Sequence, residues 1–158
     1  MNVKEQIHEL RKMLDRGDVQ ENIDEQLDKI LNRHSAEALR ELLFFRAYRE
    51  EADTLEEMWM ILRAVESFPK SIYFSVLAEC LGMFCLNAPW FAMHVLARIS
   101  NGESDTNQLV ANLSSSHLHD EQAILDVLTS IDDGQRKPAQ LERLRRIRDM
   151  VVKSKKAR

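Results

Sequence analysis

Apolar residues recur along most of this chain at intervals of three and four, the spacing that places them on one face of an α-helix. In the first segment, residues 3–15, the pattern runs through Val3, Ile7, Leu10 and Leu14. No segment shows the strict alternation of apolar and polar residues that marks a half-buried β-strand. The pattern predicts an all-α fold of eight or nine short antiparallel helices, arranged either as a compact bundle or as a HEAT-like superhelical stack.

Residues that favour helix ends divide this pattern into separate helices. Thr54 and Glu57 have the spacing of a capping box, and Pro89 suits the first position of a helix. Asn101-Gly102 predicts a left-handed stop for the helix that Pro89 begins. The other predicted boundaries are N-caps at Ser35, Ser71 and Asp120, a short helix from about Thr106 to Leu113, and a last helix that begins near Pro138.

The most apolar stretch, residues 72–99, does not have the pattern of a membrane span. Glu79, Pro89 and Arg98 interrupt it, so it contains no unbroken run of about 18 apolar residues. We expect two buried helices that are joined at residues 87–89. The Glu79 carboxylate must then be paired within the protein or reach the surface, because an isolated buried charge is costly.

Two cysteines, Cys80 and Cys85, lie in this apolar stretch. On a helix their side chains point in different directions and cannot bridge each other, so we expect reduced, buried thiols. Reduced thiols and the lack of a signal-peptide-type apolar core in the first residues favour a cytoplasmic location. The length of 158 residues fits one helical domain, which we place at residues 1–152, followed by a flexible basic tail at residues 153–158.

Charge is distributed unevenly along the chain. The net charge is −4, but residues 136–158 hold ten basic and two acidic residues, a formal +8, which leaves −12 for residues 1–135. An acidic body of this kind repels nucleic acid and attracts cationic proteins. The basic segment is either an arm that touches nucleic acid or the solvated face of a closing helix tethered to the acidic body. We favour the tethered helix, because no aromatic residue interleaves with its arginines.

Two groups of acidic residues are candidates for binding a partner protein. The first surrounds the start of the predicted fourth helix, where carboxylates also complement the helix dipole, so both interpretations stay open. The second lies on loops and helix starts of the C-terminal half. Tryptophan is enriched at binding hot spots, but Trp59 lies on an apolar stripe and is expected in the core. The candidate partner-binding residues are Glu50, Glu51, Asp53, Glu56, Glu57, Trp90, Glu103, Asp105, Asp120 and Glu121.

Motifs for catalysis or metal binding are weak in this sequence. His117, His119 and Asp120 form a metal-like cluster, but a third and a fourth ligand at zinc spacing are missing. The sequence contains no nucleophile elbow, phosphate-binding loop or dinucleotide fingerprint. We therefore expect a protein that is not an enzyme, with no metal and no cofactor.

Three segments carry a resemblance to a known family: residues 56–66 (EEMWMILRAVE), 88–92 (APWFA) and 96–99 (LARI). They resemble the family-30 immunity proteins, which are helical proteins of bacterial polymorphic toxin and contact-dependent growth inhibition systems. The resemblance covers roughly residues 37–102. The residues that it carries over are Glu56, Glu57, Trp59, Glu66, Pro89 and Trp90.

The resemblance implies that the chain binds and neutralises the C-terminal domain of a toxin delivered by a neighbouring cell. Many such toxins are nucleases, and a nuclease surface that grips phosphates is basic. The acidic body would suit this partner. We therefore expect a cognate toxin domain as the partner, with no membrane and no nucleic acid, and make no prediction of oligomeric state. The alternative is a nucleic-acid-associated regulator that uses the basic C-terminal helix.

Overall fold

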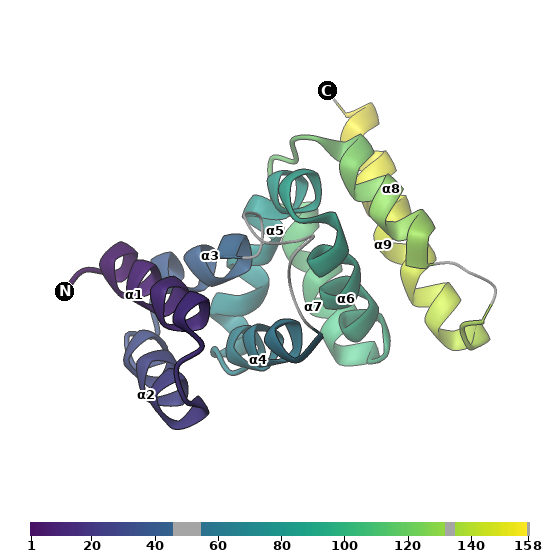
Figure 1. Cartoon of the computed structure of the whole chain (residues 1–158). Coiled ribbons are helices and arrows are strands. Elements are labelled where there is room, and N and C mark those ends of the chain that lie inside the picture. The colour runs from purple at the N-terminus through teal and green to yellow at the C-terminus, as the bar shows by residue number, and fades with distance from the viewer. Residues whose placement is uncertain (46–54, 132–134, 158) are drawn as a thin grey trace. The chain divides into compact units, whose positions relative to one another are not determined.

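The computed structural model describes residues 1–45, 55–131 and 135–157 (Figure 1). These residues form nine α-helices and no β-strand, which confirms the predicted all-α fold. In chain order the helices are α1 (Val3–Arg16), α2 (Gln20–Leu31), α3 (Ala36–Phe44), α4 (Leu55–Glu66), α5 (Lys70–Asn87), α6 (Pro89–Ser100), α7 (Glu103–Ser114), α8 (Glu121–Ile131) and α9 (Pro138–Lys156).

Most helix boundaries agree with the sequence pattern, but the link between α6 and α7 corrects it. The backbone of Asn101 has the right-handed helical conformation, with φ −70° and ψ −20°, and that of Gly102 is extended, with φ −120° and ψ 137°. The predicted left-handed stop is therefore wrong. Gly102 is instead the N-cap of α7, which begins at Glu103 rather than near Thr106. The Thr106 hydroxyl donates to the carbonyls of Gly102 at 2.8 Å and Ile99 at 3.1 Å, which fixes this short link.

Two further cap predictions have different outcomes. Ser71 lies inside α5, which begins one residue earlier at Lys70, so the predicted cap there is wrong. Ser35 is confirmed as the N-cap of α3, because its hydroxyl accepts a hydrogen bond from the amide of Ala38 at 3.1 Å. The predicted cap at Thr54 lies outside the described residues.

The chain divides into two compact units, Met1–Tyr73 and Phe74–Arg158. The assignment of residues 1–152 to one domain stays a prediction. Helix α9 continues to Lys156, so it includes most of the segment that the sequence assigned to a basic tail.

In the unit Met1–Tyr73, α1 packs against α2 and α3, and α3 packs against α4 (Figure 1). Helix α1 is closed at both ends: Asn2 and Glu5 form a capping box, and Gly17 adopts the left-handed conformation with φ 71°. Its apolar stripe is buried. The Gln26 amide donates to the Gln6 carbonyl at 2.9 Å, a buried hydrogen bond that sets the position of α2 on α1. This unit is therefore built on an α1–α2 hairpin.

In the unit Phe74–Arg158, α6 packs against α7, α8 and α9, and α9 also packs against α7 and α8 (Figure 1). The rings of Phe84 and Phe91 meet edge to face with centroids 5.8 Å apart, which joins α5 to α6 in the core. The buried Gln140 amide donates to the Ser100 hydroxyl at 3.0 Å and to the Ala97 carbonyl at 3.2 Å. Helix α9 is therefore attached to α6 through a satisfied polar contact within an apolar interface.

The apolar stretch at residues 72–99 forms α5 and α6, with the break at residues 87–89 that the sequence predicts. Glu79 is exposed on α5, which confirms that its carboxylate reaches the surface. Within the described part of the chain, no single helix is long and apolar enough to cross a lipid bilayer. Helices α4 and α5 taken together have the length and apolar composition of such a span, but the chain bends by 115° between them.

Candidate functional site

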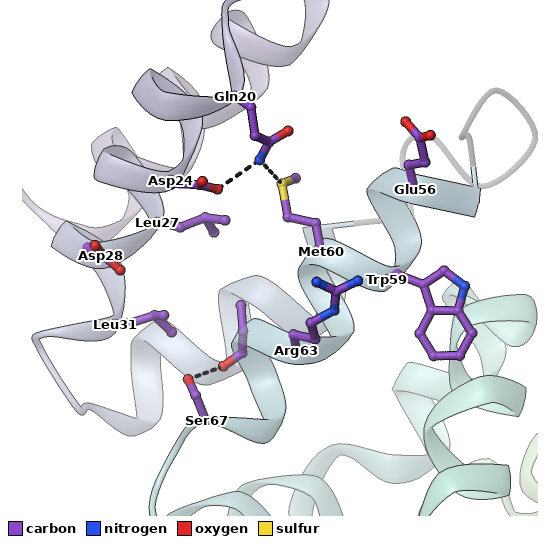
Figure 2. Close-up of a pocket in the computed structure, with 11 residues that line it drawn as sticks. Gln20, Asp24, Leu27, Asp28, Leu31, Glu56, Trp59, Met60, Arg63 and Ser67 are labelled. Atoms are coloured by element: carbon purple, nitrogen blue, oxygen red, sulfur yellow. Dashed lines mark hydrogen bonds between the residues drawn. The ribbon is translucent and has the colours of Figure 1, made fainter.

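Helices α2 and α4 of the unit Met1–Tyr73 form the walls of a groove of about 720 Å³ (Figure 2). Each wall is one helix face, because its residues recur at intervals of three and four. The α2 wall consists of Gln20, Asp24, Leu27, Asp28 and Leu31, and the α4 wall consists of Glu56, Trp59, Met60, Arg63 and Ala64, with Ser67 just beyond the helix end.

The base of the groove is lined by apolar residues, and its rims carry charged residues. Leu27 and Ala64 are buried, and Leu31 and Met60 are half-buried. One hydrogen-bonding side chain connects the two walls: the Gln20 amide donates to Asp24 Oδ1 at 2.7 Å and to Met60 Sδ at 3.7 Å (Figure 2). The groove can therefore hold a segment that is apolar in its middle and polar at its edges.

The rim charges are exposed and predominantly negative. The groove lining contains three carboxylates, those of Asp24, Asp28 and Glu56, and one guanidinium, that of Arg63, so the groove carries a formal −2. Asp28, Glu56 and Arg63 form no ion pair with any residue in the described ranges. Their charges are available to a molecule that enters the groove.

Trp59 is not the core residue that its place on the apolar stripe of α4 predicts. Its side chain is half-buried, whereas the neighbouring Met58 is 0% exposed. Trp59 contributes to the α4 wall, and its indole ring points away from α2 (Figure 2). The error has a simple cause: Met58, Ile61, Leu62 and Val65 already form the buried stripe, and Trp59 lies at its edge.

Among the predicted partner-binding residues, Glu103 has a clear role within the protein. Its carboxylate accepts from Arg143 Nε at 3.1 Å and from Arg146 Nη2 at 2.8 Å, so α7 is attached to α9. The hydrogen bond from Arg143 and the charge of Arg146 lower the pKa of Glu103 below its ordinary value. Arg143 also donates to the carbonyls of Ser100 and Asn101 at 3.2 Å, at the C-terminus of α6.

This cluster agrees with the interpretation of α9 as a helix tethered to the acidic body. Arg146 also donates to the Asn107 side chain at 2.9 Å. Arg145 forms an ion pair with Glu142 of its own helix. Three of the arginines that would have to contact nucleic acid are thus already engaged within the protein, so the observation that favours the nucleic-acid alternative becomes weaker.

The other predicted residues do not gather at one place in the described structure. Glu56 lies on the groove rim and Glu57 is half-buried beside it on α4. Asp105 is half-buried in the first turn of α7, Asp120 is exposed just before α8, and Glu121 is half-buried at the start of α8. The predicted residues Glu50, Glu51 and Asp53 lie outside the described residues. The binding roles of all the candidate residues named in this paragraph stay predictions.

Trp90 lines a second, smaller groove of about 380 Å³ in the unit Phe74–Arg158. Its indole ring is half-buried and meets the His94 ring edge to face, with centroids 5.0 Å apart. The groove lies between the α5–α6 junction and α8, and its lining is mostly apolar, with Asp126 as its one acidic member. Leu86, at its edge, is 55% exposed.

The loop that leads to α8 has a structural part in the fold. His117, His119 and Asp120 are exposed, but Leu118 is 1% exposed and anchors the loop. In the described residues, no group of three or more His, Cys, Asp or Glu side chains has an arrangement that could hold a metal ion. Cys85 is buried and Cys80 half-buried, and both are free thiols. Burial raises the pKa of the Cys85 thiol well above its ordinary value, which keeps it protonated and unreactive.

The two units differ in net charge. Residues 1–73 contain sixteen acidic and eleven basic residues, a formal −5, whereas residues 74–158 contain ten acidic and eleven basic residues, a formal +1. The basic residues of α9 therefore offset the acidic residues that precede them in their own unit. The net negative charge belongs to the unit that contains the α2–α4 groove.

The family model for Immunity protein 30 matches residues 9–109, which is well over half of the chain. The chain belongs to the Immunity protein 30 family. The match extends beyond the residues 37–102 on which the sequence resemblance rests, and it includes every residue that lines the α2–α4 groove. Helices α8 and α9 lie beyond it. No curated protein and no solved structure shows significant similarity to the chain.

Sequence reasoning found only Glu56 among the charged residues of the groove rim. Asp24, Asp28 and Arg63 were missed because they lie on ordinary exposed helix faces. A signal was present: Asp24 and Asp28, four residues apart, directly follow apolar residues of α2, and Arg63 directly follows the apolar Leu62 of α4. Nothing in the sequence pairs the face of α2 with the face of α4, however, so the groove itself required the structure.

Proposed function

We propose that this member of the Immunity protein 30 family neutralises one cognate toxin domain by binding a cationic surface of that domain with its acidic N-terminal unit. The family supplies the kind of partner, a toxin protein. The observation that carries the finer proposal is the distribution of charge: the unit Met1–Tyr73 has a formal −5, while the unit Phe74–Arg158 is close to neutral.

The charge distribution also indicates the class of toxin. An enzyme that acts on nucleic acid presents a basic surface to the phosphate backbone, and an acidic inhibitor complements that surface. We therefore propose that the toxin is a nuclease, secreted by a contact-dependent or related polymorphic toxin system. Complementary fields of this kind accelerate association at low salt and discourage wrong partners.

The test takes, as the candidate toxin domain, the C-terminal domain of the protein encoded directly upstream of this chain. The two proteins are expressed together and purified through a tag on the toxin, and cells that express the toxin are scored for survival with and without this chain. We expect a stable complex, survival only with this chain present, and inhibition of nucleic-acid cleavage by the purified toxin. A toxin that neither binds this chain nor loses toxicity in its presence would reject the proposed function.

A further inference from the structure

We propose that the α2–α4 groove receives a cationic segment of the toxin domain in which two lysine or arginine side chains flank an apolar side chain. This inference rests on the proposed immunity function and assigns the contact to one groove and one chemistry.

The cationic part of this segment follows from the α2 wall. Asp24 and Asp28 are four residues apart on one helix face, so their side chains lie about one helical turn from each other, with Cβ atoms roughly 5–6 Å apart. Both are exposed, and Asp28 forms no ion pair with a described residue. Two cations on the partner that are about one helical turn apart can therefore engage both carboxylates. Covering the groove removes water from these pairs and strengthens them.

The apolar part of the segment follows from the base of the groove. Leu27, Leu31, Met60 and Ala64 lie between the charged rims. Met60 is half-buried and linked to Gln20 by a single weak hydrogen bond to sulfur, so it can adjust to the shape of an incoming side chain. A purely polar or polyanionic ligand would leave this base uncovered and would face the carboxylates of the rim.

The alternative surfaces fit a cationic partner less well. Glu103 is already held by Arg143 and Arg146. The groove beside Trp90 has one carboxylate, that of Asp126, and lies in a unit whose formal charge is +1. The α2–α4 groove combines net negative charge, an apolar base and rim charges with no ion pair among the described residues.

The first experiment compares two double variants of α2 that change charge equally. Asp24→Lys with Asp28→Lys alters the groove wall, whereas Glu21→Lys with Glu25→Lys alters exposed positions of the same helix that do not line the groove. Affinity for a catalytically inactive form of the upstream-encoded toxin domain is measured, and thermal unfolding verifies that each variant is folded. We expect the groove variant to bind about a hundredfold more weakly, about tenfold for each lost ion pair, mainly through faster dissociation.

The control variant should lose only a few-fold, through slower association, because it alters the long-range field and, within the protein, only the exposed Glu25–Lys29 ion pair outside the groove. If wild type binds the toxin and the two variants bind equally well, the groove proposal is overturned and the immunity function stands. If wild type does not bind the toxin, the immunity function fails, and the groove proposal fails with it.

The second experiment identifies the occupant. A photo-crosslinking amino acid replaces Met60 in the groove or, as the control, Val19, which is 63% exposed outside it. We expect the crosslinker at position 60 to label one toxin segment that contains at least two lysine or arginine residues. The crosslinker at position 19 should label that segment weakly or not at all. Labelling of a toxin segment without basic residues, or of a second copy of this chain, would overturn the proposal.

Discussion

At the residue scale, Gly82 shows how a single missing side chain permits a contact in the fold. A Cβ atom at this buried position of α5 would lie 1.6 Å from the carbonyl oxygen of His119 and 2.7 Å from its carbonyl carbon. Both atoms are backbone, so they cannot move aside as the end of a side chain can. The glycine therefore allows the loop before α8 to approach α5.

We predict that Gly82→Ala lowers the free energy of unfolding by about 1–3 kcal/mol, the usual cost of overpacking a closely packed site. The direction is informative, because alanine inside a helix is otherwise favoured over glycine by about 1 kcal/mol. Urea unfolding followed by circular dichroism measures the change, and Ser75→Ala at an exposed position of α5 is the control. A Gly82→Ala protein at least as stable as wild type would contradict this contact.

Adjacent residues of α4 give a second prediction at this scale, in which the smaller side chain matters more. Met58 is 0% exposed and Trp59 is half-buried. Met58→Ala should lower the free energy of unfolding by about 2–5 kcal/mol, because it leaves a cavity in the core. Trp59→Ala should cost less, about 2 kcal/mol, because part of its side chain is already exposed to water in the folded protein. Urea titrations of both variants test the order, and a larger loss for Trp59→Ala would place that ring in the core.

At the element scale, the sequence predicts helix type and most helix ends well because both depend on local interactions. The capping box of α1 and the left-handed Gly17 involve residues that are close together in the chain. The error at Gly102 arose because one residue serves two adjacent helices: Gly102 follows α6 but takes the extended conformation of an N-cap residue for α7. Trp59 was misplaced because periodicity does not show where a buried stripe ends.

The attachment of α9 to α7 predicts a pH dependence of stability. The pKa of Glu103 is lower in the folded protein than its ordinary value, because Arg143 and Arg146 favour the ionised form. The stability that Glu103 contributes is therefore fully present above its ordinary pKa and is lost as the pH falls through the lowered folded value. Glu103→Gln should abolish this contribution, so wild type and variant should converge in stability as the pH falls.

The measurement is urea unfolding across the acidic range in a Trp59→Phe background, in which the tryptophan fluorescence comes from Trp90 in the same unit as Glu103. Because Glu103 is exposed, solvent and salt screen its ion pairs, so the effect should be small and should shrink further at high salt. Asp149→Asn removes an exposed carboxylate from α9 and serves as the matched control. A constant difference between Glu103→Gln and wild type at every pH would contradict the ion-pair assignment.

At the scale of the whole molecule, the sequence showed that charge is separated along the chain. It did not show which acidic residues are engaged within the protein and which can attract a partner. The −12 of residues 1–135 is an arithmetic total that includes the acidic residues of the second unit. The structure shows that Glu103 of that unit is engaged by arginines of α9, and the division into units assigns the net negative charge to residues 1–73. The groove between α2 and α4 could not be predicted, because it depends on how two helix faces are brought together.

This distribution predicts how salt affects binding to the toxin domain. Long-range attraction between an acidic unit and a cationic partner raises the association rate and is screened by ions, so the association rate should fall about tenfold or more from low to high ionic strength. The Glu21→Lys, Glu25→Lys variant reduces the negative charge of the N-terminal unit, so its association rate should depend less steeply on ionic strength.

A control variant neutralises two lysines at the exposed end of α9, Lys155→Gln with Lys156→Gln, and makes the C-terminal unit more negative without changing the groove. It should leave the association rate and its salt dependence nearly unchanged if the N-terminal unit steers the encounter. Stopped-flow or surface-based kinetics at several salt concentrations measure these rates, and an association rate that ignores ionic strength would rule out electrostatic steering by the acidic unit.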